Sequence, residues 1–276
     1  MSDAEFYRAY DALLARWPVP VEPVDVASVY GTTRVNVCGP ADGEPLVLLH
    51  GGGATSTVWF GVVGELSRRY RVYAVDQLGD VGRSVAGGIP LGGPGDLLSW
   101  LDGLFDHFGV DGGYVVGHSY GAWLALSYTL HAPARVGRLA LLDPTGCFAG
   151  LSPSYVLHAL PLLTRPRADR ARSFLRWETA GAPVDPGWVD VYALGAEQPK
   201  AKTVMPRRPS PRQLLASEVP ALVLLAEQSR CHDVRRVEAR ARTLLRARTA
   251  TLPGATHHSI PAAGADRIAR ELLAFG

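Results

Sequence analysis

The chain has 276 residues, of which 47% are hydrophobic, so it can build the core of one large α/β domain. Its net charge of +2, from 28 basic and 26 acidic side chains, argues against a nucleic-acid-binding surface over the whole chain. Three widely spaced cysteines, a polar N-terminus and the absence of long apolar runs argue against a disulfide framework, a signal peptide and a membrane span. We therefore expect a reduced, cytoplasmic protein.

Short apolar runs alternate with helix-like stretches along most of the chain. Six runs are nearly continuous in apolar character, as strands covered on both faces should be; they span residues 45–50, 71–76, 114–118, 138–143, 221–226 and 249–253. Helical patterns between them, such as 97–108 and 122–131, indicate a parallel sheet with right-handed crossovers. Residues 26–39 alternate around Gly31 and Thr32, which predicts an antiparallel hairpin at one sheet edge.

One interval departs from this alternation. From about residue 147 to 217 no strand pattern is present, and helix-like pieces at 154–163, 168–179 and 187–197 are separated by prolines. We interpret this interval as a helical lid over the carboxyl edge of the sheet, within a single domain of residues 1–276. Its basic segment, 199–212, is most simply a solvated loop, and the alternative is a docking patch for an acyl carrier protein.

The stretch Gly117-His118-Ser119-Tyr120-Gly121 lies between a predicted strand and a predicted helix. In that position G-x-S-x-G is the pattern of a nucleophile elbow, a sharp turn that exposes the serine and requires small neighbours. The helix after the serine directs backbone N–H groups at the reacting centre and favours developing negative charge. Ser119 is therefore the predicted nucleophile, and a purely structural turn is the alternative.

A glycine-rich loop, HGGGATSTVW, follows the predicted strand at 45–50. An oxyanion hole needs two backbone N–H groups directed at one point, and glycine lets the backbone approach a substrate closely. We predict that Gly52 and Tyr120 supply these groups, with Gly53 as an alternative. An apolar substrate pocket is expected from Trp59, Phe60 and Trp123 together with the aromatic residues of the lid, unless the lid aromatics only pack the lid down; these are Tyr155, Trp177, Trp188 and Tyr192.

A serine hydroxyl needs a histidine to take its proton and later return it. Two adjacent histidines, His257 and His258, directly follow the last predicted strand. The turn at Gly254 would direct His257 toward the elbow, so His257 is the predicted base and His258 the alternative. His118 is too close in sequence to reach Ser119, and His50 is expected to serve its own loop.

These motifs, in this order, resemble those of the α/β-hydrolase superfamily, and within it a group of bacterial carboxylesterase-like serine hydrolases. The likeness covers almost the whole chain, including the segments YDALLARWPVPVEPV, YGTTRVNVCG, HGGGATSTVW, GHSYGA and GATHH. The resemblance implies an α/β-hydrolase fold, with a mostly parallel eight-stranded sheet, helices on both faces and a helical lid. It also implies a Ser–His–acid triad without metal or cofactor.

The acid is where this chain departs from the family pattern. That pattern places the acid last in Gly-Glu-x-Asp or Gly-Glu-x-Glu after the strand at 221–226, where this chain has Ser229. We rank Asp143, which ends the strand at 138–143, first among the substitutes, followed by Asp233 and Glu227. A turn-capping role for Asp143 and a site without any acid remain alternatives.

We expect a serine hydrolase that cleaves an ester, thioester or lactone of a small to medium apolar substrate through an acyl-enzyme on Ser119. The serine at position 229 motivates an alternative, a non-hydrolytic biosynthetic enzyme such as a cyclase or carbon–carbon lyase on the same fold. Epoxide hydrolases and haloalkane dehalogenases are disfavoured because their chemistry requires a carboxylate at the elbow. The expected partner is a small-molecule substrate, with no nucleic acid and no membrane.

Overall fold

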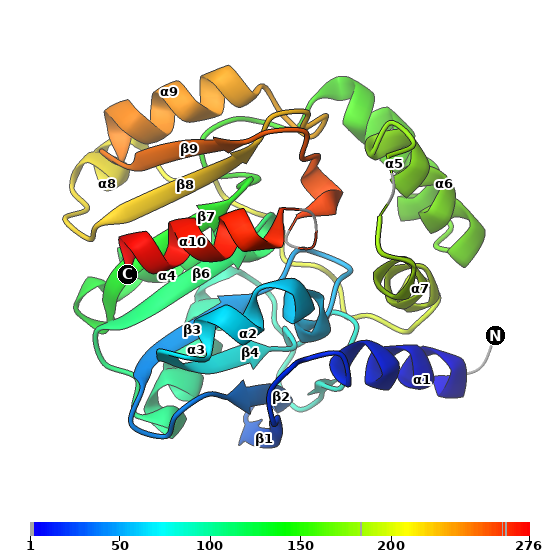
Figure 1. The fold of residues 1–276 in the computed structure, drawn as a ribbon, viewed down its shortest axis with the longest axis horizontal. Helices are drawn as coiled ribbons and strands as arrows, with labels where there is room; N and C mark the ends of the chain where they lie inside the picture. Colours follow the sequence, from blue (N-terminus) through cyan, green and yellow to red (C-terminus); the bar gives the residue numbers. More distant parts are fainter. Residues whose placement is uncertain (1–2, 183, 261, 263) are drawn as a thin grey trace.

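The computed structural model describes residues 3–276 except 183, 261 and 263. Within these residues the chain forms a nine-stranded sheet, in which eight strands follow the order β1-β2-β4-β3-β6-β7-β8-β9 and the short β5 pairs with β2 (Figure 1). The strands are β1 (Glu22–Ser28), β2 (Gly31–Cys38), β3 (Glu44–Leu49), β4 (Tyr70–Val75), β5 (Val85–Ala86), β6 (Gly113–His118), β7 (Val136–Leu142), β8 (Ala221–Ala226) and β9 (Arg248–Leu252).

Most neighbouring strands in this sheet are parallel. The run β4-β3-β6-β7-β8-β9 is parallel throughout, and only the pairings of β2 with β1, β4 and β5 are antiparallel. The predicted mostly parallel sheet is therefore confirmed. The hairpin turns between Ser28 and Gly31, slightly earlier than the sequence pattern indicated. Gly31 opens β2 with a φ of +132°, and a Cβ there would lie 2.2 Å from the carbonyl oxygen of Val85. Both observations require a glycine at this position.

Helices cover both faces of the sheet, as predicted. Side chains that alternate along each strand enter two separate cores: Leu46 and Leu48 of β3 enter one, and Val47 and Leu49 the other. The helices are α1 (Asp3–Leu14), α2 (Val63–Leu66), α3 (Pro94–Phe108), α4 (Tyr120–His131), α5 (Pro153–Thr164), α6 (Ala168–Glu178), α7 (Pro186–Gly195), α8 (Pro211–Leu215), α9 (Val234–Leu244) and α10 (Ala265–Phe275).

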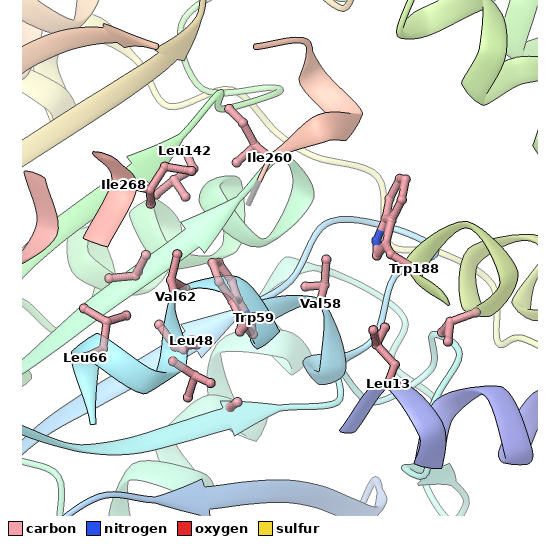
Figure 2. Close-up of a cluster of buried hydrophobic side chains, with 14 of the residues drawn as sticks. Leu13, Leu48, Val58, Trp59, Val62, Leu66, Leu142, Trp188, Ile260 and Ile268 are labelled. Atoms are coloured by element: carbon pink, nitrogen blue, oxygen red, sulfur yellow. The ribbon is translucent and has the colours of Figure 1, made fainter. Parts of the chain in front are cut away.

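The two cores differ in the helices that close them. Residues of α2 and α10 pack on the first core, in which Figure 2 shows Leu48, Val62, Leu66 and Ile268 converging. Residues of α3, α4 and α9 close the second core, on the opposite face. None of the helices in the described part of the chain has the length and apolar character of a transmembrane span.

Helices α5 to α8 lie between β7 and β8, where the sequence predicted helices without strands. In Figure 1, α5, α6 and α7 lie beyond the ends toward which the arrows of the central strands point. Helix α1 packs against α7, and Arg16 joins Asp185 through two hydrogen bonds of 2.7 and 2.8 Å. Helices α5, α6 and α7 are therefore held near the carboxyl edge of the sheet, partly by the N-terminal helix, whereas α8 lies beside the start of β8.

Candidate active site

Ser119 occupies a strained turn between β6 and α4. Its φ of 53° and ψ of −113° lie outside the regions that non-glycine residues normally adopt. A Cβ at Gly117 would lie 2.2 Å from the carbonyl oxygen of Gly121, and a Cβ at Gly121 would lie 2.2 Å from that of Leu49. Real Cβ atoms do not approach backbone so closely, so both flanking glycines are required for the turn to form.

The turn brings Ser119 against a histidine from the far end of the chain. The Oγ atom of Ser119 lies 2.8 Å from Nε2 of His257, which begins the short 3₁₀ helix His257–Ser259 after β9. The opposite ring nitrogen, Nδ1 of His257, lies 2.6 Å from Oδ2 of Asp143 in the loop after β7. Serine, imidazole and carboxylate thus form one continuous line of hydrogen bonds.

The Asp143 carboxylate is fully buried and accepts hydrogen bonds on both oxygens. Its Oδ1 accepts from the backbone N–H of Ala226 at 3.1 Å, and its Oδ2 accepts from the hydroxyl of Ser229 at 2.7 Å. Burial raises the pKa of Asp143, but the nearby His232 and His257 outweigh burial and lower this pKa well below its usual range. Asp143 is therefore ionised at neutral pH, as a carboxylate that orients an imidazole must be.

The other two candidate carboxylates lie elsewhere. Glu227 accepts from the backbone N–H of Gly254 at 2.8 Å, and Asp233 caps the start of α9 by accepting from the N–H of Arg236 at 3.0 Å. Asp143 is thus the one of the three ranked candidates that reaches His257. Ser229, which stands where the family pattern has its acid, contacts the same carboxylate from the neighbouring strand end.

A second buried carboxylate, Glu178 at the end of α6, holds the loop that carries His257. Its oxygens accept from the backbone N–H groups of His257 and His258 and from the Thr256 hydroxyl, each at 3.0 Å. Burial raises the pKa of Glu178, but hydrogen bonding and charge from His258 outweigh burial and lower the pKa to about 2. No pattern in the sequence indicated this contact, because an acid on an amphipathic helix normally faces solvent.

His258, the alternative base, lies beside the pocket without contacting Ser119. Its Nδ1 atom is 3.6 Å from Glu178, and no ring nitrogen of His258 is paired with the serine in the described residues. His118 turns away from the serine, and its Nε2 lies 3.0 Å from the carbonyl oxygen of His257. His50 holds its own loop, since its Nδ1 lies 2.8 Å from the carbonyl oxygen of Gly51, and it joins this loop to the end of β4, since its Nε2 accepts from the backbone N–H of Gln77 at 3.0 Å.

The glycine loop lies directly against the elbow. A Cβ at Gly51 would lie 3.2 Å from Cβ of Ser119, and a Cβ at Gly52 would lie 3.8 Å from that of Tyr120. The N–H of Gly53 already donates to Asp80 at 2.8 Å. In the described part of the chain, the N–H groups of Gly52 and Tyr120 make no hydrogen bond outside regular helices and strands, so they are available to a ligand.

A small pocket lies above Ser119. It is lined by the glycine loop, the two ring systems Trp188 and Tyr192 of α7, and apolar side chains; the described lining residues are Gly51, Gly52, Ala54, Val58, His118, Ser119, Trp188, Tyr192, His257, His258 and Ile260. The pocket is thus roofed by α7 and has both apolar walls and the polar groups of the site.

Of the aromatic residues that the sequence suggested for this pocket, Trp188 and Tyr192 line it, and the others are not among its described lining residues: Trp59, Phe60, Trp123, Tyr155 and Trp177. Trp59 is fully buried in the core, whereas its neighbour Val58 in the 3₁₀ turn Ser56–Gly61 lines the pocket, although both belong to the hydrophobic cluster of Figure 2. Phe60 lies under the guanidinium of Arg16, at 4.3 Å.

Two of the other aromatics pack the α5–α8 segment, as the alternative interpretation held for Trp177. Trp123 donates from its indole nitrogen to the carbonyl oxygen of Arg207 at 3.0 Å, and Trp177 stacks on His158 with ring centroids 3.9 Å apart. The two aromatic residues that do line the pocket, Trp188 and Tyr192, come from the predicted lid helix at 187–197.

Residues 46–271 match the model of the alpha/beta hydrolase family, and the chain belongs to this family. It is carboxylesterase-like in sequence: it is 30% identical over 240 residues to the carboxylesterase nap of Bacillus subtilis (strain 168), which covers 83% of this chain and 77% of that protein. It is also 32% identical over 178 residues to the carboxylesterase YbfK of the same organism, covering 64% of this chain and 59% of the relative.

Solved structures agree with the sequence comparison. The crystal structure of naproxen esterase from Bacillus subtilis is 28% identical, with a TM-score of 0.88 over 98% of this chain and 99% of that chain. The crystal structure of the carboxylesterase CesB (YbfK) from Bacillus subtilis is 26% identical, with a TM-score of 0.91 over 99% of this chain and 97% of that chain. The likeness thus extends over the whole fold, beyond the motifs at the site.

Proposed function

We propose that this protein is a serine esterase that cleaves small to medium apolar esters through an acyl-enzyme on Ser119. One observation carries the proposal: Oγ of Ser119 and Oδ2 of Asp143 lie 2.8 and 2.6 Å from the two nitrogens of one buried imidazole, His257. This is the arrangement that general-base activation of a serine requires. The carboxylesterase relatives support an ester over a thioester or lactone.

The first half of the reaction forms the acyl-enzyme. As Oγ of Ser119 attacks the ester carbonyl, Nε2 of His257 takes the hydroxyl proton, and ionised Asp143 stabilises the resulting imidazolium. The carbonyl oxygen becomes an oxyanion, which the N–H groups of Gly52 and Tyr120 bind. His257 then returns the proton to the departing alcohol as its bond to the acyl carbon breaks.

The second half of the reaction releases the acid. A water molecule takes the place of the alcohol, gives a proton to Nε2 of His257 and attacks the acyl carbon. The second oxyanion collapses, the bond to Oγ of Ser119 breaks, and the serine recovers its proton from the imidazolium. The apolar pocket walls formed by Val58, Ile260 and Trp188 favour an acyl group with little polar surface.

We further propose that residues 147–217 act as a lid within a single domain. Helix α7 roofs the pocket through Trp188 and Tyr192, which supports this role. The loop 199–212 packs on the elbow helix, where Tyr120 donates from its hydroxyl to the carbonyl oxygen of Val204 at 2.9 Å. Docking of an acyl carrier protein on this loop and the cytoplasmic location stay predictions from the sequence.

Hydrolysis of short p-nitrophenyl esters and labelling by a fluorophosphonate probe test the esterase assignment. The wild-type protein should hydrolyse the esters and take up the probe on Ser119, whereas Ser119→Ala should do neither. An unlabelled wild-type protein without ester turnover would remove the proposal.

The alternative of a non-hydrolytic cyclase or lyase arose from the serine at position 229. The 2.6 Å contact of Asp143 with Nδ1 of His257 supports Asp143 as the acid and so favours the hydrolytic route. Ser119→Ala also separates these functions. Conversion of a cyclisable substrate that survives the substitution would favour the non-hydrolytic route over a covalent one.

A further inference from the structure

The Asp143 carboxylate lies between two imidazoles. Its Oδ2 is 2.6 Å from Nδ1 of His257, and its Oδ1 is 3.3 Å from Nε2 of His232, in the loop between β8 and α9. The two histidine rings are nearly perpendicular, with centroids 6.4 Å apart. A serine–histidine–carboxylate line needs only the first imidazole, so the second one calls for a separate explanation.

His232 is not held by aligned hydrogen bonds. Its side chain is 1% exposed, and neither ring nitrogen makes a well-directed hydrogen bond within the described residues. Burying polar atoms without such partners costs free energy, which a neutral structural imidazole would not recover here. The contact with Asp143 therefore has the character of an ion pair, in which attraction depends on charge and distance more than on direction.

Three titratable groups face His232: Asp143 from the loop after β7, its chain neighbour Cys231, and His257 after β9. Burial lowers the pKa of His232, but the negative charge of the neighbouring Asp143 carboxylate outweighs burial and raises the pKa to about 9. His232 is then an imidazolium at neutral pH, although it is buried.

The positive charge of His232 counteracts the raised pKa of His257, which would otherwise weaken His257 as a base. Burial lowers the pKa of His257, but Cys231 and Asp143 outweigh burial and raise the pKa well above its usual value. A general base must be unprotonated at the working pH, so a strongly raised pKa would leave most of the enzyme without its base. A positive charge on the far side of the same carboxylate disfavours a second proton on His257.

We propose that His232 is a positioning residue, an imidazolium that binds the Asp143 carboxylate opposite His257 and keeps His257 free to accept the Ser119 proton at neutral pH. The proposal rests on the serine mechanism given above. It assigns His232 no contact with the substrate, and its effect reaches the reaction only through Asp143 and His257.

His232→Gln removes the charge and keeps a side chain that can donate to Asp143. With the cation gone, His257 holds its proton to higher pH, so the acidic limb of the kcat/KM–pH profile should move up by about one pH unit. Hydrolysis at pH 6 should fall about tenfold relative to the wild type, whereas on the alkaline plateau above the acidic limbs of both profiles the two proteins should agree within about threefold.

His131→Gln is the matched control, because His131 contacts Asp102 at 3.1 Å in another histidine–aspartate pair, exposed and outside the site. Its pH profile should coincide with that of the wild type. An equal loss at every pH in His232→Gln, with the acidic limb unmoved, would assign His232 a packing role and overturn the proposal. Fluorophosphonate labelling of the wild type tests the serine mechanism separately.

A ¹⁵N NMR titration of the wild-type histidines does not depend on the folding of any variant. The expected result is that His232 stays doubly protonated from pH 6 to about pH 8. A neutral His232 at pH 7 would overturn the proposal even in a fully active enzyme.

Discussion

At the scale of single residues, the proposed acid of the site, Asp143, lies at a different strand end from the position that the family pattern indicates. Asp143 follows β7, and Ser229, at the family position of the acid, follows β8. These strands are parallel neighbours, with Leu142 opposite Leu224, so their carboxyl ends meet at one point. The 2.7 Å contact between the Ser229 hydroxyl and Asp143 shows how close the two positions are.

Because positions 143 and 229 are so close, a carboxylate at position 229 should restore part of the activity lost when Asp143 is replaced. Asp143→Asn should lower kcat by roughly 10³–10⁴-fold, because His257 loses the carboxylate that orients it and stabilises its cation. Adding Ser229→Asp to that variant should restore kcat by at least about tenfold, since it returns a carboxylate to the same edge of the sheet. Steady-state hydrolysis of a p-nitrophenyl ester measures both effects.

Ser229→Asp alone is the control for this rescue. In the wild-type background it places a second carboxylate against Asp143, and the repulsion should lower activity. A double variant no more active than Asp143→Asn would show that the two positions are not interchangeable.

Some residues of the site could be predicted from the sequence and others could not. Ser119 and His257 could be assigned because a motif and its order along the chain mark them. Asp143 stayed one of three candidates, because no pattern tells which of several strand ends faces an imidazole that lies 114 residues away in the chain. Glu178 and His232 could not be found, since their roles arise from contacts between distant segments.

At the scale of elements, the contact between α6 and the loop that carries His257 predicts that one substitution lowers both stability and activity. Glu178→Gln replaces one acceptor oxygen by an NH₂ group that faces the backbone N–H groups of His257 and His258. At pH 7 the free energy of unfolding should fall by about 3 kcal/mol. The kcat should fall about tenfold, because the loop no longer holds His257 in place.

The pH dependence has a definite sign. The pKa of Glu178 falls from its ordinary value of 4.5 to about 2 on folding, so the carboxylate stabilises the fold fully above pH 4.5 and loses this contribution as the pH falls toward 2. The difference in the free energy of unfolding between wild type and Glu178→Gln, measured by urea unfolding, should therefore be larger at pH 7 than at pH 3. Glu227→Gln, which alters an exposed acceptor of a backbone N–H, is the control; an equal gap at both pH values would contradict the account.

Elements were easier to predict than contacts between them. Buried parallel strands are almost wholly apolar, so the runs in the sequence match β3, β4, β6, β7, β8 and β9 within about two residues. The hairpin turn was misplaced because Gly31 suggested a turn, whereas its positive φ serves the close approach of β5. The prediction that Trp59 lines the pocket was wrong, because a short 3₁₀ turn has no long periodic pattern that shows which of its residues face the core.

At the scale of the whole molecule, one buried network ties α1 to the sheet and to the glycine loop. The Tyr10 hydroxyl donates to Asp76 at 3.0 Å and accepts from Asn36 at 2.8 Å, while Asp76 also accepts from the Ser56 hydroxyl at 2.6 Å. The network joins the N-terminal helix, β2, the end of β4 and the turn that follows the glycines. It anchors the same helix that packs against α7, the roof of the pocket.

Tyr10→Phe should therefore affect stability more than chemistry. It deprives Asn36 and Asp76 of a buried partner and should lower the free energy of unfolding by about 1–3 kcal/mol, with kcat changed less than about threefold. Urea unfolding and ester hydrolysis measure the two quantities. Tyr7→Phe is the control, since Tyr7 is only half-buried; equal destabilisation by both variants would contradict the role of this network.

The most direct test of the central claim is to trap the acyl-enzyme. Wild-type protein mixed with p-nitrophenyl acetate and quenched in acid within the first turnover should gain the mass of one acetyl group, and peptide mapping should place it on Ser119. His257→Ala should gain none in the same time. Ester hydrolysis without any acetylated serine, or with the acetyl group on another residue, would contradict the mechanism.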